Sequence, residues 1–270
     1  MAPVGDGLRL SLEGEVEHHI EAGLLLVADG ANSRLCQQLG VVTEEKPYGQ
    51  SALVANVGSR QPHDSRAFER FTDEGPLALL PLLGVAGCEQ RSALVWTLPP
   101  DSAEEMQHCS QEQFLARLQE RFGYRLGRLR QVGERVVYPL TLSQSSEQVR
   151  QGVVVMGNAA HSLHPVAGQG FNLALRDVAE LARIIADGVA RGRAPGDLRV
   201  LQGYRERQRS DQVRTIGFSD LVPGLFMNDD PLLGVGRDLA LAGLDIMPAL
   251  KREFVRHAAG VASLSESYRD

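Results

Sequence analysis

Aromatic residues and cysteine are scarce in this sequence. Of its 270 residues, 5% are Phe, Trp or Tyr, one is tryptophan and three are cysteine. The cysteines, Cys36, Cys88 and Cys109, are odd in number, far apart and free of any Cys-x-x-Cys pair. This pattern excludes a disulfide framework and a cysteine-based zinc site, and it indicates reduced thiols in a cytoplasmic protein.

An excess of positive charge is also missing. Lysine and arginine number 28 against 34 aspartate and glutamate, which gives a formal net charge of −6. Binding to a phosphate backbone requires a basic surface, so we expect no nucleic-acid partner.

Long apolar runs are absent as well. The longest stretch without a charged residue or histidine, residues 75–88, has 14 residues and contains Pro76 and Pro81. It is too short and too broken to span a bilayer. The first seven residues carry no Lys or Arg and lead into an alternating apolar pattern, so we expect no secretory signal.

The order of the apolar segments predicts an α/β protein with an inserted sheet. Two continuous apolar runs, residues 24–28 and 152–156, are typical of strands buried on both faces of a parallel sheet. Between them lie several segments with strand composition, which predict a separate sheet: residues 51–57, 67–71, 77–82, 92–98 and 131–142.

Capping residues predict two shorter helices. Asn32 or Ser33 can begin a brief helix that ends at Gly40. Ser110 and Gln113 form a capping-box pattern ahead of a helix that runs through residue 122.

Apolar spacing predicts a long helix over residues 171–187, and the chain from residue 198 onward also has helical character. The inner face of the long helix would carry four apolar residues: Ala174, Val178, Leu181 and Ile185. The predicted organisation is an α/β domain made of residues 1–40 and 144–190, a β-sheet domain of residues 41–143, and a helical region of residues 191–270.

The segment from Gly157 to Asn172 is the one most suited to chemistry. It lies between a predicted buried strand and the start of the long helix, and it contains Gly168 and Gly170. Glycines permit close approach of a ligand, and the free N–H groups at a helix start favour an electron-rich one. No lysine follows in the position that a P-loop requires.

Two segments match known motifs. The first is Asp29-Gly30-x-x-Ser33, and the second is Gly157-Asn158-Ala159-Ala160-His161 followed by Pro165, Gly168, Gly170, Asn172 and Asp177. They resemble the "DG" and "GD" motifs of FAD-dependent aromatic hydroxylases of the p-hydroxybenzoate hydroxylase fold. The wording of the second motif, with residues 66–71 and 208–211, is similar to the ubiquinone-biosynthesis branch of that family, in particular to the 2-octaprenyl-6-methoxyphenol hydroxylases.

The resemblance implies a partial FAD/NAD(P)-binding domain, a β-sheet substrate domain and C-terminal helices, with FAD as cofactor, NAD(P)H as reductant and O₂ as co-substrate. It implies ten FAD-binding residues: Asp29, Gly30, Gly157, Asn158, Pro165, Gly168, Gln169, Gly170, Phe171 and Asn172. Candidates for catalytic contact are Pro165, His161, Arg70 and Tyr138. No general base is assigned.

The sequence departs from the family pattern in three places. Asn158 replaces the usual Asp, which keeps a hydrogen bond to a hydroxyl but removes a charge. Cys36 stands where the DG motif commonly ends in Arg. The opening Gly-x-Gly-x-x-Gly unit is not found, because Gly236 is followed by Leu239 where the third glycine would stand. We therefore expect that the chain begins well inside the natural protein and retains FAD weakly.

The implied substrate is a polyprenylated methoxyphenol. Because burial of each CH₂ group gains about 0.8 kcal/mol, such a substrate must come from a membrane or a carrier surface. We therefore expect a peripheral contact with the inner face of the membrane, or with a ubiquinone-biosynthesis assembly, through apolar residues such as Phe226 and Met227. A metal is not expected, since His161 and His164 have no carboxylate or thiol close in sequence.

Two other interpretations stay open. A related flavin prenyl-lipid reductase would share the flavin motifs without the oxygen chemistry. A non-catalytic fragment or scaffold subunit would share the fold alone.

Overall fold

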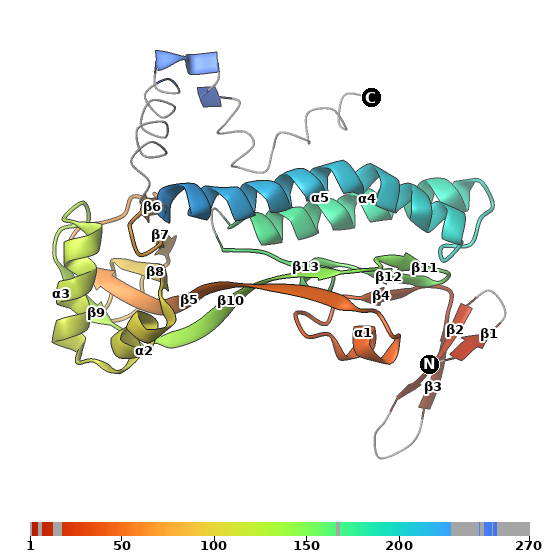
Figure 1. Ribbon diagram of the computed structural model, residues 1–270, viewed down its shortest axis with the longest axis horizontal. Coiled ribbons are helices and arrows are strands. Elements are labelled where there is room, and N and C mark those ends of the chain that lie inside the picture. Colours follow the sequence, from red (N-terminus) through yellow and green to blue (C-terminus); the bar gives the residue numbers. More distant parts are fainter. Residues whose placement is uncertain are drawn as a thin grey trace. The chain divides into compact units, whose positions relative to one another are not determined.

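The computed structural model describes residues 2–4, 7–12, 18–165, 168–227, 243, 246–249, 251 and 252 (Figure 1). The chain forms two compact units. The first comprises Met1–Lys46, Thr141–Asp220 and Ala249–Asp270, and the second comprises Pro47–Leu140 and Leu221–Pro248.

A small sheet in the order β11-β12-β4 forms the centre of the first unit. Strands β4 (Leu25–Val27) and β12 (Val153–Val155) pair in parallel, as the two apolar runs predict, and β11 (Val149–Arg150) is antiparallel to β12. All three residues of β12 are buried. The expectation for β4 is wrong in one respect: Leu26 is 47% exposed, because β4 is the edge strand of this sheet.

Both faces of β12 are covered by helices of the first unit. Val153 and Val155 pack in a cluster with Cys36 of α1 (Arg34–Gln38), and Val154 packs with Leu181 and Tyr204 on the opposite side. Helix α1 begins as predicted, since the Ser33 hydroxyl accepts a hydrogen bond from the Cys36 amide. Gly40 follows the helix with the positive φ of 68° that glycine adopts without strain.

A separate three-stranded antiparallel sheet near the N-terminus was not predicted. It consists of β1 (Ala2–Val4), β2 (Gly7–Leu12) and β3 (His18–Ala22). Only the alternation of Leu8, Leu10 and Leu12 hints at it, and β3 has no continuous apolar pattern because four of its five residues are exposed.

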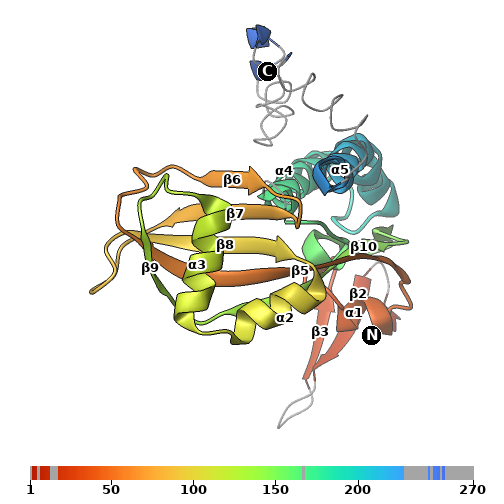
Figure 2. The same cartoon turned by 60° about the vertical axis from the view of Figure 1, so that its left-hand side comes forward.

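Helices α4 (Gln169–Ala190) and α5 (Leu198–Met227) lie side by side in both views (Figures 1 and 2). The predicted inner face of α4 is wrong by about one residue, since Val178 is 50% exposed. The buried residues are Gln169, Leu173, Asp177, Leu181 and Gly188. The polar Asp177 interrupts the apolar spacing and thereby hides the true inner face from the sequence pattern.

Among the described residues, no helix is both long enough and apolar enough to cross a membrane. The side chains of Phe226 and Met227 lie outside the residues that the structure describes.

The larger sheet follows the order β13-β10-β5-β8-β7-β6, and β9 also pairs with β5. Its strands are β5 (Thr43–Ser59), β6 (Phe68–Phe71), β7 (Pro76–Leu82), β8 (Arg91–Leu98), β9 (Leu129–Val132), β10 (Val136–Ser145) and β13 (His161–Ser162). The single strand predicted over residues 131–142 is wrong. Two strands occupy this region, and Gly133 between them donates its amide to the Asn56 carbonyl.

Two helices cover one face of this sheet, as Figure 2 shows: α2 (Pro100–His108) and α3 (Gln111–Phe122). The predicted capping box of α3 is present, with Ser110 and Gln113 bonded reciprocally. Phe114, Leu118 and Phe122 are buried in the core of the second unit with Trp96. Helix α2 was not predicted because only Ala103 and Met106 of its residues are buried, which leaves little apolar periodicity.

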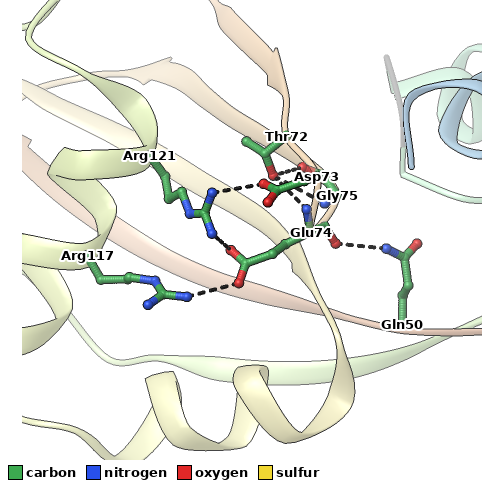
Figure 3. A network of polar contacts seen from close by, with 7 residues as sticks. All are labelled: Gln50, Thr72, Asp73, Glu74, Gly75, Arg117 and Arg121. Atoms are coloured by element: carbon green, nitrogen blue, oxygen red, sulfur yellow. Dashed lines mark hydrogen bonds and ion pairs between the residues drawn. The ribbon is translucent and has the colours of Figure 1, made fainter. Parts of the chain in front are cut away.

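A polar network fixes the turn between β6 and β7 to α3 (Figure 3). Glu74 forms ion pairs with Arg117 at 2.9 Å and with Arg121 at 3.0 Å, and Arg121 also pairs with Asp73 at 2.8 Å. The Glu74 side chain is only 16% exposed, whereas that of Asp73 is 69% exposed. The network therefore depends mainly on Glu74.

We expect Glu74→Leu to lower the free energy of unfolding by about 1–2 kcal/mol, because Arg121 would lose its least exposed partner. Asp73→Asn, the matched control in the same turn, should change it by less than about 0.5 kcal/mol. Fluorescence of Trp96, the sole tryptophan and a core residue of this unit, reports the urea transition. Equal effects of the two substitutions would contradict this ranking.

Candidate functional site

Two predicted motif segments meet at one edge of the small parallel sheet. Asp29 and Gly30 follow β4, and Gly157 and Asn158 follow β12. The strands are adjacent and parallel, and the Met156 amide donates to the Val27 carbonyl at 2.9 Å. Gly30 and Gly157 are 127 residues apart in sequence (157 − 30), yet the segments that contain them leave the sheet side by side. Ligands of open α/β sheets bind at this carboxyl edge.

Three glycines near the start of α4 leave open space, and we call Gly157, Gly168 and Gly170 the glycine cluster. Gly157 opens the 3-10 turn η1 (Gly157–Ala159), which packs against α4. Gly157 has a φ of 60° and Gly168 a φ of 61°. A Cβ atom added at any of the three would meet nothing within 4 Å.

The N-terminus of α4 has no side-chain cap. Gly168 is the N-cap residue, and the first turn contains no acidic residue. The helix dipole favours negative charge at this turn. Phe171 is 73% exposed on the first turn, beside the glycine cluster in sequence.

Asp29 is engaged with the helix that follows it. Its Oδ2 accepts a hydrogen bond from the Leu35 amide at 3.3 Å. Burial works to raise the pKa of Asp29, but hydrogen bonds from Ser33 and from the backbone outweigh it, so that the pKa lies below its ordinary value. Asp29 is accordingly a carboxylate that fixes the turn after β4.

The four candidates for catalytic contact fall into different units. His161 and Pro165 belong to the first unit with the glycine cluster, whereas Arg70 and Tyr138 belong to the second. The Arg70 guanidinium donates to the Phe122 carbonyl at 3.0 Å, and Tyr138 is 54% exposed on β10. His161 is 2% exposed, so its ring is enclosed by the protein.

A buried polar group next to the glycine cluster was only partly visible in the sequence. His161 Nε2 lies 3.3 Å from Asp177 Oδ2, and Gln212 Nε2 donates to Asp177 Oδ1 at 3.2 Å. Asp177 belongs to the predicted motif, but Gln212 was missed. Its only signal is its place four residues after Gln208, another buried glutamine of α5.

His164 lies in the same segment and is 1% exposed. Burial lowers its pKa to about 4, although the charge of Asp220 acts in the opposite direction. Its carbonyl accepts a hydrogen bond from the Ser219 hydroxyl at 3.1 Å. His164 is therefore neutral in the folded protein near pH 7.

We expect His164 to make the protein sensitive to acid. The pKa of His164 falls from 6.5 to about 4 on folding, so the unfolded chain binds this proton at a higher pH than the folded protein does. The free energy of unfolding is therefore unaffected by protonation of His164 above pH 6.5, and it decreases by about 3 kcal/mol in all as the pH falls toward 4. His164→Gln should flatten the loss of stability between these two pH values in denaturant titrations. An unchanged slope would show that other groups cause it.

Among the described residues, no three His, Cys, Asp or Glu side chains gather in a way that could hold a metal ion.

The fold and this site define an α/β protein in which two motif segments leave adjacent parallel strands at the same edge of a sheet. Residues 7–216 match the family model described as FAD binding domain. The chain belongs to this family of FAD-binding proteins.

Curated relatives include the ubiquinone hydroxylase UbiL of Rhodospirillum rubrum, which is 37% identical over 245 residues, covering 91% of this chain and 56% of the relative. The 3-demethoxyubiquinol 3-hydroxylase of Escherichia coli is 32% identical over 248 residues, covering 92% of this chain and 61% of the relative. The chain thus spans a little over half the length of these relatives.

A solved structure, p-nitrophenol 4-monooxygenase PnpA from Pseudomonas putida, superposes with a TM-score of 0.73 at 18% identity, covering 95% of this chain and 64% of that one. At this identity the likeness shows the fold alone. It confirms the predicted fold of the p-hydroxybenzoate hydroxylase type.

The residues at the site fit FAD. The observation is the glycine cluster, where an added Cβ atom would meet nothing within 4 Å, beside a helix start whose dipole favours an electron-rich group. The absence of any acidic residue in the first turn of α4 removes the repulsion that a negative ligand would meet.

Proposed function

We propose that this chain forms the substrate sheet and part of the FAD-binding site of a flavin monooxygenase that hydroxylates a polyprenylated methoxyphenol in ubiquinone biosynthesis. The names of the relatives support the reaction and the pathway. The observation that carries the proposal is the uncapped N-terminus of α4 beside the glycine cluster.

When bound, FAD would supply the redox chemistry, namely transfer of electrons from NAD(P)H to O₂, one oxygen atom of which would enter the new hydroxyl group. The chain contributes binding and orientation. The backbone amides of Phe171 and Asn172 face the electron-rich edge of the ring, where negative charge is stabilised by the helix dipole, and Gly168, Gln169 and Gly170 lie around the ring.

Other residues are proposed to hold the rest of the cofactor and the substrate. Asn158 is exposed next to Gly157, and its amide can bond a cofactor hydroxyl. Asp29 and Gly30 support the cofactor from the adjacent strand end. The backbone at Pro165 contacts the substrate ring. We assign no catalytic base to this chain.

The substrate class implies a lipid or carrier surface as its source. Each buried CH₂ group of a prenyl tail gains about 0.8 kcal/mol outside water, so a polyprenyl phenol does not reach the site from free solution. We propose that the protein works at the membrane surface or within an assembly of ubiquinone-biosynthesis proteins.

A test combines a flavin titration with isotope labelling. The chain should bind FAD weakly, with a change in the flavin spectrum at high FAD concentration, and any product formed under ¹⁸O₂ should carry one ¹⁸O atom. Flavin binding with consumption of NAD(P)H but no label in the product would indicate a prenyl-lipid reductase. No flavin binding at all would overturn the assignment and leave a non-catalytic role.

A further inference from the structure

Three buried polar side chains connect the motif segment to both long helices. His161 is on β13, Asp177 is on α4 and Gln212 is on α5. Their exposed fractions are 2%, 0% and 8%. Gln212 Nε2 lies 3.2 Å from Asp177 Oδ1, and His161 Nε2 lies 3.3 Å from Asp177 Oδ2. We call these residues the polar clamp.

The polar clamp is one of several connections that hold the segment after β12. The Ala160 carbonyl accepts the Ser145 amide at 2.7 Å, on the side of β10. The His164 carbonyl accepts the Ser219 hydroxyl of α5 at 3.1 Å. Both of these bonds act on the backbone of the segment. The polar clamp instead acts through the His161 side chain and includes a residue of α4.

Helices α4 and α5 are also joined without the polar clamp. Arg176 pairs with Asp211 at 2.7 Å, and Gln208 Nε2 donates to the Arg176 carbonyl at 3.0 Å. Loss of the Gln212 bond would therefore leave the two helices connected. An effect of removing the Gln212 bond can therefore be distinguished from a loss of contact between α4 and α5.

The chemistry of the polar clamp indicates orientation more than stability. A fully buried carboxylate needs donors. In the part of the chain that the structure describes, Gln212 donates a side-chain hydrogen bond to Asp177, whereas His161 Nε2 lies 3.3 Å from the other carboxylate oxygen without hydrogen-bond geometry. Apolar side chains of similar volume would often give equal or greater stability at such a site. The 3.3 Å contact with Asp177 also holds the His161 ring nitrogen against a polar partner, which an apolar side chain at residue 177 would not supply.

We infer that Asp177 and Gln212 are positioning residues: through His161 they fix the 157–162 turn against the first turns of α4, and so set the spacing of the glycine cluster. The inference rests on the proposed function for the identity of the ligand, FAD. Neither residue is assigned a contact with the reacting atoms.

The test compares two glutamines of the same helix face. Gln212→Leu removes the donor to Asp177, and the matched control Gln208→Leu removes the donor to the Arg176 carbonyl from a residue that is equally buried. Amide hydrogen exchange followed by mass spectrometry reports the peptides covering residues 157–165 and 168–175. FAD affinity is measured separately by flavin fluorescence.

For Gln212→Leu we expect exchange of both peptides to rise about tenfold and FAD to bind about tenfold more weakly, as for loss of a hydrogen bond to a buried charged group. Gln208→Leu should lower the denaturation midpoint to a similar extent without these local changes. Equal exchange in the two variants, or no change in Gln212→Leu, would overturn the inference.

Asp177→Asn provides a second test if Gln212→Leu does not fold. The asparagine keeps the side-chain volume and an acceptor for Gln212 but removes the charge that faces His161. Exchange at residues 157–165 should still rise, and unchanged exchange would contradict the inference. If the unmodified chain binds no FAD, the proposed function fails, while the exchange data still decide whether the polar clamp positions this segment.

Discussion

Gly170→Leu should weaken FAD binding about ten- to hundredfold while leaving the fold intact. A leucine side chain would enter the open space at the glycine cluster, where the added Cβ meets nothing within 4 Å. A ligand forced against it loses about 1–3 kcal/mol, which corresponds to that change in affinity. Fluorescence titration of FAD gives the dissociation constant.

The stability of this variant separates a blocked site from a damaged fold. Gly170 lies inside α4 without a positive φ, so leucine should alter the free energy of unfolding by less than about 1 kcal/mol in either direction. Gly217→Leu, on an exposed and equally open position of α5, is the control and should bind FAD normally. Undiminished affinity in Gly170→Leu would remove the glycine cluster from the cofactor site.

Gly196→Ala should lower the free energy of unfolding of the first unit by about 3 kcal/mol or more. A Cβ atom at Gly196 would lie 2.1 Å from the Gly23 carbonyl oxygen and 2.9 Å from the Gly152 Cα. Both neighbours are backbone, so no side chain can rotate away. The Gly196 carbonyl also accepts the Gly152 amide at 2.9 Å, just before β12 begins.

A second glycine of the same unit gives the opposite expectation. Gly203 lies within α5, and a Cβ atom there meets nothing within 4 Å. Gly203→Ala should raise the free energy of unfolding by about 0.5–1 kcal/mol, because alanine loses less backbone entropy in a helix. Circular dichroism is the suitable probe, since Trp96 belongs to the other unit. An unchanged free energy of unfolding in Gly196→Ala would show that the segments at Gly23 and Gly152 can move apart to admit the methyl group.

Local patterns were sufficient for the elements whose stability is local. The capping box at Ser110, the cap at Ser33 and the left-handed Gly40 all depend on residues within a few positions of each other, and the structure contains each of them. The two parallel strands were also predicted, because their apolar residues are continuous in sequence.

The failures arose where a distant contact determines burial. Leu26 is exposed because β4 is an edge strand, and the turn at Gly133 depends on its bond to Asn56 in another strand. Val178 lies outside the core because Asp177 is buried in its place, with a hydrogen bond from Gln212 of α5 and the His161 ring of β13 at 3.3 Å. Hydrophobic periodicity assigns a carboxylate to the solvent-exposed face of a helix, so it could not predict that Asp177 is buried.

The sequence by itself determined that this chain carries two flavin-family motifs, a strand at each of them and a long helix after the second, because motif spacing and apolar runs are properties of neighbouring residues. Only the tertiary structure decided that the motifs leave adjacent strands, and that Gln212 reaches Asp177 from 35 residues away. Those relations depend on which segments pair in space, and pairing is determined by packing over the whole unit rather than by the local pattern.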